Sequence, residues 1–262
     1  MEDQRVAIVT GSSGGIGRAV ALRLAQAEIA VAIASRTDDR YPGTNAETVD
    51  LIRAAGGIAE AFECDLSKRE DRLGLITRVT DKLGPVEILV NNAAVSTMEP
   101  LSTFPEKRLT LMFDVQVRAP FELSQQVLPG MMKAGRGWII NVSSPAAFHP
   151  VAGGEADGNP GRTTVYGMCK IALERFSTGL AAEVYDDGIN VVALAPTAVV
   201  PTFGANAFFD VNKYDLEPPE VMAEAIAHLV DTDSEAPRVT GQILYSQRVL
   251  AGAGIPIPKV HA

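Results

Sequence analysis

The two residues whose spacing most suggests chemistry are Tyr166 and Lys170, at the start of an amphipathic segment that extends to about Tyr185. On a helix, residues four apart lie on one face, so the phenol hydroxyl and the ammonium would point the same way. A phenol has an ordinary pKa of roughly 10, which makes it a poor acid or base near neutrality. A fixed cation beside it favours the phenolate and lowers that pKa, so the pair could move a proton. Tyr-x-x-x-Lys also arises by chance on many helices, so the elements that would position the pair matter.

A glycine-rich stretch follows the first predicted strand, at 6–9. It runs from Thr10 to Arg18 and leads into a helical pattern. Glycines at a strand-to-helix turn allow sharp backbone geometry, and the helix N-terminus offers N–H donors and a partial positive charge to a phosphate. The order of strand, glycine-rich turn and helix predicts a dinucleotide site, and an ordinary tight turn is the alternative.

The end of the second predicted strand, at 30–35, bears on which dinucleotide would bind. In NAD-binding βαβ units an acidic residue near this point bonds the ribose hydroxyls. Here Ser35 and Arg36 stand in that place. A guanidinium suits a 2′-phosphate, and no carboxylate is expected there to repel it. The sequence therefore favours NADP(H) over NAD(H), with a solvated arginine at a strand end as the alternative.

Short apolar runs alternate with helical patterns along the chain. Strands are predicted at 6–9, 30–35, 58–63, 86–90, 138–142, 189–194 and 242–245; the longest helical pattern covers 105–134, bent near Pro120, and a Gly/Pro-rich tail follows the last strand. This alternation predicts an α/β fold: a single Rossmann-type doubly wound parallel sheet with helices on both faces, in one domain over 1–262. Residues 145–163 are predicted to form a long loop that shapes or covers a substrate pocket. Residues 197–219 are predicted to cover substrate or to contact a second subunit.

Composition excludes several classes of function. The 262 residues carry a net charge of −9, which argues against a nucleic-acid partner. The two cysteines and three scattered histidines show no metal-ligand spacing, so we expect no metal and two reduced, buried or half-buried thiols. The acidic start and the shortness of the longest apolar run, 191–200, predict no signal peptide and no membrane segment, hence a cytoplasmic protein.

Taken together, these motifs resemble the short-chain dehydrogenase/reductase family over essentially the whole chain. The matching positions are Thr10, Gly11, Gly15 and Gly17 of a glycine motif, Asn91, Asn92 and Ala93 of Asn-Asn-Ala-Gly with Ala94 in place of glycine, the strand-terminal Ser144, and Tyr166 and Lys170. The resemblance implies that Tyr166 exchanges a proton with a carbonyl or alcohol oxygen that Ser144 orients. It further implies that Lys170 lowers the tyrosine pKa and holds the nicotinamide ribose.

The resemblance also implies a set of cofactor contacts near the ends of the predicted strands. They are Gly11, Ser13, Gly15, Ile16, Gly17, Arg36, Asp65, Leu66, Asn92, Ala93, Ala94, Tyr166, Lys170, Pro196 and Thr197. Within this set, Asp65 is expected to bond the adenine. The implied partners are a small carbonyl or alcohol substrate and further copies of the chain, as a homodimer or homotetramer.

Four departures from the family pattern limit the analogy. Gln116 stands where the family has a catalytic asparagine, so the proton relay is expected to be weakened. The sequence separation between Ser144 and Tyr166 is longer than the usual spacing in the family. Thr197 replaces the glycine after Pro196, and Ser246-Gln247-Arg248 stands in the region of the frequent Asp-Gly-Gly.

The expected function is thus an NADP(H)-dependent oxidoreductase that interconverts a ketone and a secondary alcohol. A 3-oxoacyl thioester is one candidate substrate, and a steroid, terpenoid or other apolar carbonyl compound is the other. A cofactor-binding protein with weak catalysis is the alternative. Gln116 and Thr197 support that alternative, whereas the intact Ser144, Tyr166 and Lys170 oppose it.

Overall fold

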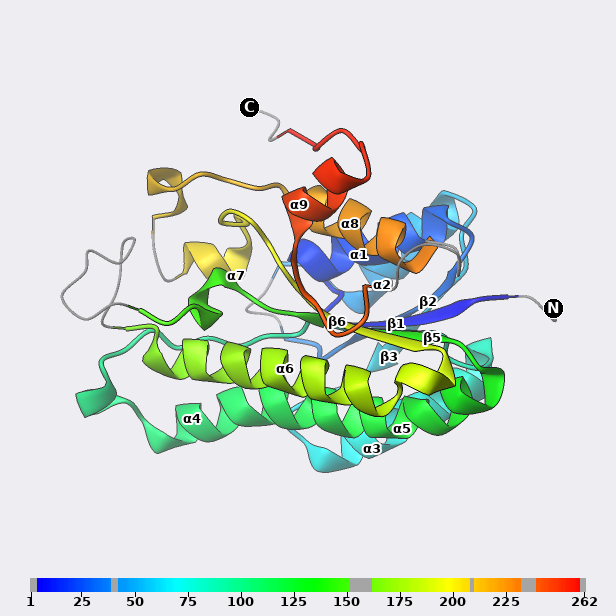
Figure 1. Cartoon of the computed structure of the whole chain (residues 1–262), viewed down its shortest axis with the longest axis horizontal. Coiled ribbons are helices and arrows are strands. Elements are labelled where there is room, and N and C mark those ends of the chain that lie inside the picture. Colours follow the sequence, from blue (N-terminus) through cyan, green and yellow to red (C-terminus); the bar gives the residue numbers. More distant parts are fainter. Residues whose placement is uncertain (1–3, 39–41, 151–161, 208–209, 232–238, 260–262) are drawn as a thin grey trace.

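A computed structural model describes residues 4–38, 42–150, 162–207, 210–231 and 239–259. Within these ranges the centre is a seven-stranded parallel sheet in the order β3-β2-β1-β4-β5-β6-β7 (Figure 1). The strands are β1 (Val6–Thr10), β2 (Ala30–Ser35), β3 (Ala59–Glu63), β4 (Ile88–Asn91), β5 (Gly137–Val142), β6 (Ile189–Ala195) and β7 (Ile243–Tyr245). The predicted doubly wound parallel sheet is confirmed.

Every residue of β1, β2, β4 and β5 is buried. Short runs rich in β-branched and aliphatic residues are typical of parallel strands that are covered on both faces. The strand order changes direction between β1 and β4, so their carboxyl ends lie side by side at one edge of the sheet. That edge is where open α/β sheets bind ligands.

Helices cover the sheet in two layers (Figure 1). One layer holds α1 (Gly15–Gln26), α2 (Asn45–Ala54), α8 (Pro219–Asp231) and α9 (Ser246–Gly252), and the other holds α3 (Arg69–Leu83), α4 (Glu106–Phe113), α5 (Ala119–Ala134) and α6 (Thr164–Glu183). A separate apolar core lies on each face of the sheet. Successive strand residues point to opposite faces, so Ala7 packs in one core and Ile8 in the other. The short helix α7 (Phe203–Asn206) lies beyond the strand ends.

The helical segments after β4 and β7 contain features that the sequence did not predict. The pattern at 105–134 includes a π-helical turn, Asp114–Arg118, between α4 and α5. Pro120 lies two residues after this turn, where the backbone is helical on both sides, so its missing N–H does not end the helix. The segment after β7 is not only a tail, because α9 begins directly at Ser246.

The two predicted loops are partly described. Residues 145–147 form a 3₁₀ turn, and Phe148 stacks on Tyr245 with ring centroids 5.8 Å apart, while 151–161 lie outside the described residues. The segment 197–219 contains α7 and a parallel bridge between Val199 and Leu216. No helix in the described part of the chain has the length and apolar character needed to cross a bilayer.

Candidate active site

A cavity of about 2210 Å³ opens at the carboxyl ends of the strands. The segments that follow β1, β2, β3, β4, β5 and β6 all contribute to its wall. Every residue predicted for the site lines this cavity except Gly17 and Gln116. The topology therefore brings together residues that lie far apart in the sequence.

The glycine-rich turn after β1 is built for close backbone approach. Gly11 has φ 66°, and a Cβ there would lie 2.9 Å from the Cα of Ala93. A Cβ on Gly17 would lie 2.3 Å from the Gly11 carbonyl oxygen, so Gly17 serves packing within the turn. Helix α1 begins at Gly15, and no side chain caps its N-terminus. Its first N–H groups are thus left for an anion in the cavity.

The end of β2 differs from expectation in one respect. Arg36 lines the cavity, as does Asp38, and the two form a salt bridge of 3.0 Å. The expectation that no carboxylate lies near Arg36 is therefore wrong. Because a guanidinium carries five N–H donors, pairing with a carboxylate does not exclude a contact with a phosphate.

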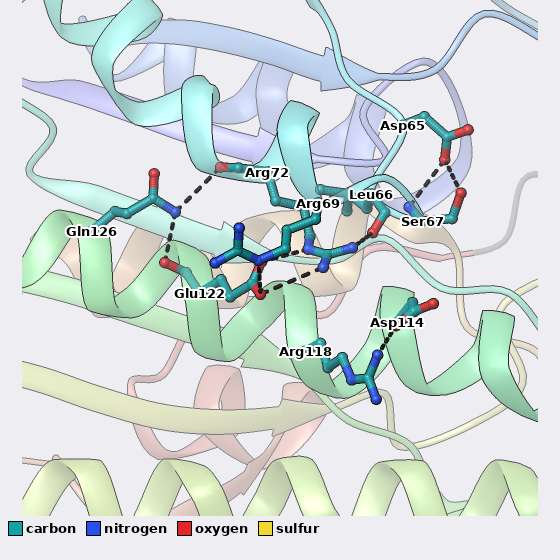
Figure 2. A network of polar contacts seen from close by, with 9 residues as sticks. All are labelled: Asp65, Leu66, Ser67, Arg69, Arg72, Asp114, Arg118, Glu122 and Gln126. Atoms are coloured by element: carbon teal, nitrogen blue, oxygen red, sulfur yellow. Dashed lines mark hydrogen bonds and ion pairs between the residues drawn. The ribbon is translucent and has the colours of Figure 1, made fainter.

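The loop after β3 holds Asp65 and Leu66 against the cavity. The Asp65 carboxylate accepts hydrogen bonds from the N–H and hydroxyl of Ser67, at 3.0 and 2.7 Å, so its orientation is fixed (Figure 2). The Leu66 carbonyl accepts from the Arg72 guanidinium at 2.8 Å, and Arg72 pairs with Glu122 of α5 at 2.6 Å. An ion pair between α3 and α5 thus anchors this part of the wall.

The loop after β4 is tied to the glycine-rich turn. The Asn92 amide donates to the Thr10 carbonyl at 2.8 Å, and the Thr10 hydroxyl accepts from the N–H groups of Asn92 and Ala93. Asn92 therefore fixes the backbone of two neighbouring loops. Ala93 and Ala94 line the cavity directly.

The residues expected to do chemistry meet on one side of the cavity. Ser144, two residues after the end of β5, caps the 3₁₀ turn and lines the cavity together with Tyr166. The Lys170 ammonium lies 5.5 Å from the centroid of the Tyr166 ring and donates to the Val142 carbonyl at 2.8 Å. Only 2% of Lys170 is exposed, so a single turn of α6 places a half-buried phenol beside a buried cation.

The acidities of this pair differ from the expectation. Burial raises the pKa of Tyr166 to about 12, and the hydrogen bond with Ser144 opposes that rise. Burial lowers the pKa of Lys170 to about 8, opposed by the charges of Cys169 and Glu174. The net shift of the phenol pKa is upward because desolvation is its largest cause, and the role of Lys170 in lowering that pKa stays a prediction. The phenol is held in its protonated form near neutrality.

Gln116 lies in the π-helical turn, behind the cavity wall. Its amide nitrogen donates to the carbonyl of Val95, a cavity residue, at 2.8 Å. Its amide oxygen is buried and has no hydrogen-bond partner among the described residues. A π turn inserts one extra residue into a helix and is frequent at functional sites. Here it turns the amide towards the loop after β4.

The turn after β6 is held by an acid that the sequence did not single out, Glu217. Thr197 lines the cavity, and its N–H donates to Glu217 at 3.1 Å and to the Ser246 hydroxyl at 3.1 Å. Glu217 is fully buried, as is Ser246. An isolated acid before two prolines gives no local signal of such a role, so reasoning from the sequence missed it.

Comparison with known proteins identifies the family of this chain. The model of the short chain dehydrogenase family matches residues 5–211. The chain belongs to the short-chain dehydrogenase/reductase family. This membership makes it one of the NAD(P)-dependent oxidoreductases, and the resemblance read from the motifs is confirmed.

Relatives within the short-chain dehydrogenase/reductase family cover most of this chain. The human dehydrogenase/reductase SDR family member 4 is 32% identical over 267 residues, covering 96% of this chain and 87% of its own. A short chain dehydrogenase of Pseudocercospora fijiensis is 37% identical over 204 residues, which are 77% of this chain but 62% of that protein. A metagenomic short-chain oxidoreductase crystallised in complex with NADP superposes with a TM-score of 0.74 at 30% identity, covering 92% of this chain and 96% of that one.

The cavity of this family member fits a nicotinamide dinucleotide. Its wall joins the uncapped N-terminus of α1, the Arg36 guanidinium and the Tyr166–Lys170 pair in one continuous space. The glycine positions leave room that a Cβ would fill. Among the described residues, no group of three or more His, Cys, Asp or Glu side chains is placed to hold a metal ion.

Proposed function

We propose that this protein is an NADP(H)-dependent oxidoreductase that interconverts a ketone and a secondary alcohol. The observation that carries the proposal is that Ser144, Tyr166 and the buried Lys170 ammonium meet on the wall of a dinucleotide-sized cavity. The bound nicotinamide would supply or accept the hydride.

The side chains supply the proton and the orientation. Ser144 donates to the carbonyl oxygen and holds it beside the phenol. Tyr166, protonated near neutrality, gives its proton to that oxygen as the alcohol forms, and takes one back in the reverse direction. Lys170 places positive charge beside the phenol and so stabilises the phenolate that remains after proton transfer.

Arg36 supports the choice of NADP(H). Its guanidinium lies at the cavity wall beside β2, where a 2′-phosphate would be bound. The salt bridge to Asp38 keeps the guanidinium in place and lowers its gain from binding phosphate. We therefore propose NADP(H) with a moderate preference over NAD(H).

The lining favours an apolar carbonyl substrate. The segments 145–150 and 197–216 contribute Phe148, Val199, Phe203 and Leu216 to the cavity. A steroid, terpenoid or comparable ketone suits such a wall. A 3-oxoacyl thioester is the second candidate, because exposed Lys213 of the same segment lines the cavity and would suit a carrier's phosphate.

An NADPH oxidation screen over apolar ketones and 3-oxoacyl thioesters tests the proposal, with Tyr166→Phe as the matched variant. We expect kcat to fall about 10²- to 10⁴-fold in Tyr166→Phe, since the proton donor is lost, while NADPH still binds. Isothermal titration with NADPH checks the binding. NADPH binding without turnover in the parent would favour a cofactor-binding protein, and equal turnover in both proteins would refute the role of Tyr166.

We also propose a homodimer or homotetramer that forms through the outer faces of α5 and α6. Phe121 of α5 is 51% exposed and packs its ring against Phe176 of α6, with centroids 6.1 Å apart. Met132 of α5 is also exposed. Exposed apolar side chains that lie on neighbouring helices are typical of subunit interfaces. Light scattering should give a mass of two or four chains, and a monomer at micromolar concentration would contradict the assembly.

A further inference from the structure

Three of the positions at which the sequence departs from its family meet at one buried carboxylate. The Glu217 carboxylate accepts from the Thr197 N–H at 3.1 Å, from the Ser246 hydroxyl at 2.6 Å and from the Gln247 amide at 2.9 Å. Thr197 stands in place of the glycine after Pro196, and Ser246 and Gln247 stand in the region of the frequent Asp-Gly-Gly. Because Thr197, Ser246 and Gln247 share the Glu217 carboxylate as a partner, they form one hydrogen-bonded network.

Thr197 uses its side chain in the same network. Its hydroxyl accepts from the N–H of Gln247 at 3.2 Å, in the first turn of α9, and lies 3.3 Å from the Ser246 hydroxyl. A glycine could make neither contact. Thr197 therefore joins the end of β6 to the start of α9 by side-chain bonds as well as through Glu217.

Glu217 also joins this turn to the segment that follows it. Its N–H donates to the Val199 carbonyl at 2.9 Å, and the Val199 N–H donates to the Asp215 carbonyl at 3.0 Å. These bonds form the isolated bridge that closes the segment 199–216 at its base. Thr197, Val199 and Gln247 line the cavity, whereas Glu217 does not and touches the wall from behind.

We propose that Glu217 is a positioning residue, whose carboxylate fixes the Thr197 turn and the base of the 199–216 segment so that the cavity wall is set for the cofactor. This role of Glu217 requires side-chain oxygens that accept hydrogen bonds, and it does not require a negative charge. Both Thr197 N–H and the Gln247 amide donate to the same oxygen, Oε2. A glutamine can present its carbonyl oxygen there and its NH₂ group to the Ser246 hydroxyl, which can rotate to accept.

Hydrogen–deuterium exchange and NADPH titration on four variants test the proposal. Glu217→Met removes the acceptors, and we expect exchange over 196–217 to be about tenfold faster and the NADPH Kd to rise about tenfold. Glu217→Gln should stay within about twofold of the parent in both. Ser246→Val should loosen the same peptide by about threefold, and the double variant with Glu217→Met should add little, because both act on one turn.

Ser177→Ala is the control for a merely structural loss. Ser177 is fully buried in α6 and accepts from Asn141 at 2.8 Å, away from the cavity lining. It should lower stability without loosening 196–217 or changing the NADPH Kd. Equal exchange in the parent, Glu217→Met and Ser246→Val would overturn the proposal, as would a Glu217→Gln variant that loosens as much as Glu217→Met. If Glu217→Met does not fold, the exchange rates of Ser246→Val and Glu217→Gln over 196–217 test the proposal instead.

The affinity readout rests on the proposed function, whereas the exchange readout does not. If the parent binds no NADPH, the cofactor assignment fails. Faster exchange over 196–217 in Glu217→Met would then still support the anchoring role.

Discussion

The loop after β3 and the turn after β6 both form cavity wall, yet different chemistry holds them in place. Behind Leu66 lies an ion pair between Arg72 and Glu122, which joins α3 to α5 (Figure 2). Behind Thr197 lies the Glu217 carboxylate, which is surrounded by uncharged donors. The first anchor depends on two opposite charges, and the second depends on the directions of several hydrogen bonds.

This difference predicts different sensitivity to pH. The hydrogen bond and charge of Arg72 hold the pKa of Glu122 below its usual value of 4.5. A carboxyl with a lowered pKa stabilises the folded state above its ordinary pKa, and this contribution is lost as the pH falls through the lowered value. Acid should therefore loosen the Leu66 loop through the Arg72–Glu122 pair.

The largest expected effect comes from breaking the ion pair. Arg72→Met leaves the Glu122 carboxylate without its buried partner, and we expect a loss of about 3 kcal/mol in the free energy of unfolding, measured with urea. Arg69→Met is the matched control, because Arg69 approaches Glu122 only to 4.0 Å and its side chain is 72% exposed. It should cost less than about 0.5 kcal/mol. Similar losses in the two variants would show that burial does not decide the strength of this anchor.

Lys170, unlike Arg72, is a buried cation without a close carboxylate partner among the described residues. The pKa of Lys170 is lowered from 10.5 to about 8, so between these values the folded chain has released a proton that the unfolded chain still holds. Stability relative to Lys170→Met should therefore rise by about 3 kcal/mol from pH 7 to pH 11. Urea unfolding of both proteins across that range measures it. A constant difference would mean that Lys170 keeps its ordinary pKa.

A smaller effect is expected at the adenosine end, where an ion pair lies directly on the cavity wall. Arg36→Ala should raise the NADPH Kd roughly 10- to 100-fold, because a charge-assisted contact is lost. The NADH Kd should change little. Asp38→Asn should have the opposite effect on NADPH, since it removes the carboxylate that competes for Arg36. Equal losses for the two nucleotides would place the 2′-phosphate elsewhere.

The smallest effect is expected at Gln116. Gln116→Asn restores the amide length of the family, and we expect kcat to rise only a few-fold, about 1 kcal/mol in the barrier. Steady-state kinetics with the best substrate of the carbonyl screen would measure it. A fall in kcat would indicate that the longer amide, which reaches the Val95 carbonyl, is adapted to this site.

Local patterns explain which parts could be predicted from the sequence. The strands, the glycine-rich turn and the Tyr166–Lys170 pair each occupy one short stretch, so periodicity and spacing reveal them. Contacts across long separations leave no such pattern: Arg72 lies 50 residues from Glu122, and Glu217 lies 20 from Thr197 and 29 from Ser246. The raised pKa of Tyr166 has no local pattern in the sequence for the same reason, because burial is a property of the assembled wall.

The π-helical turn at Asp114–Arg118 allows this chain to lose one residue without turning its flanking helices. The turn holds one residue more than an α-helical turn, so removing that residue would let α4 and α5 merge into one continuous α-helix with their faces in register. Met112 would keep its packing with Val165 and Cys169 beside Tyr166, whereas the Gln116 amide would no longer be turned towards the Val95 carbonyl. A single-codon deletion in this turn should thus change the Gln116 contact far more than the fold.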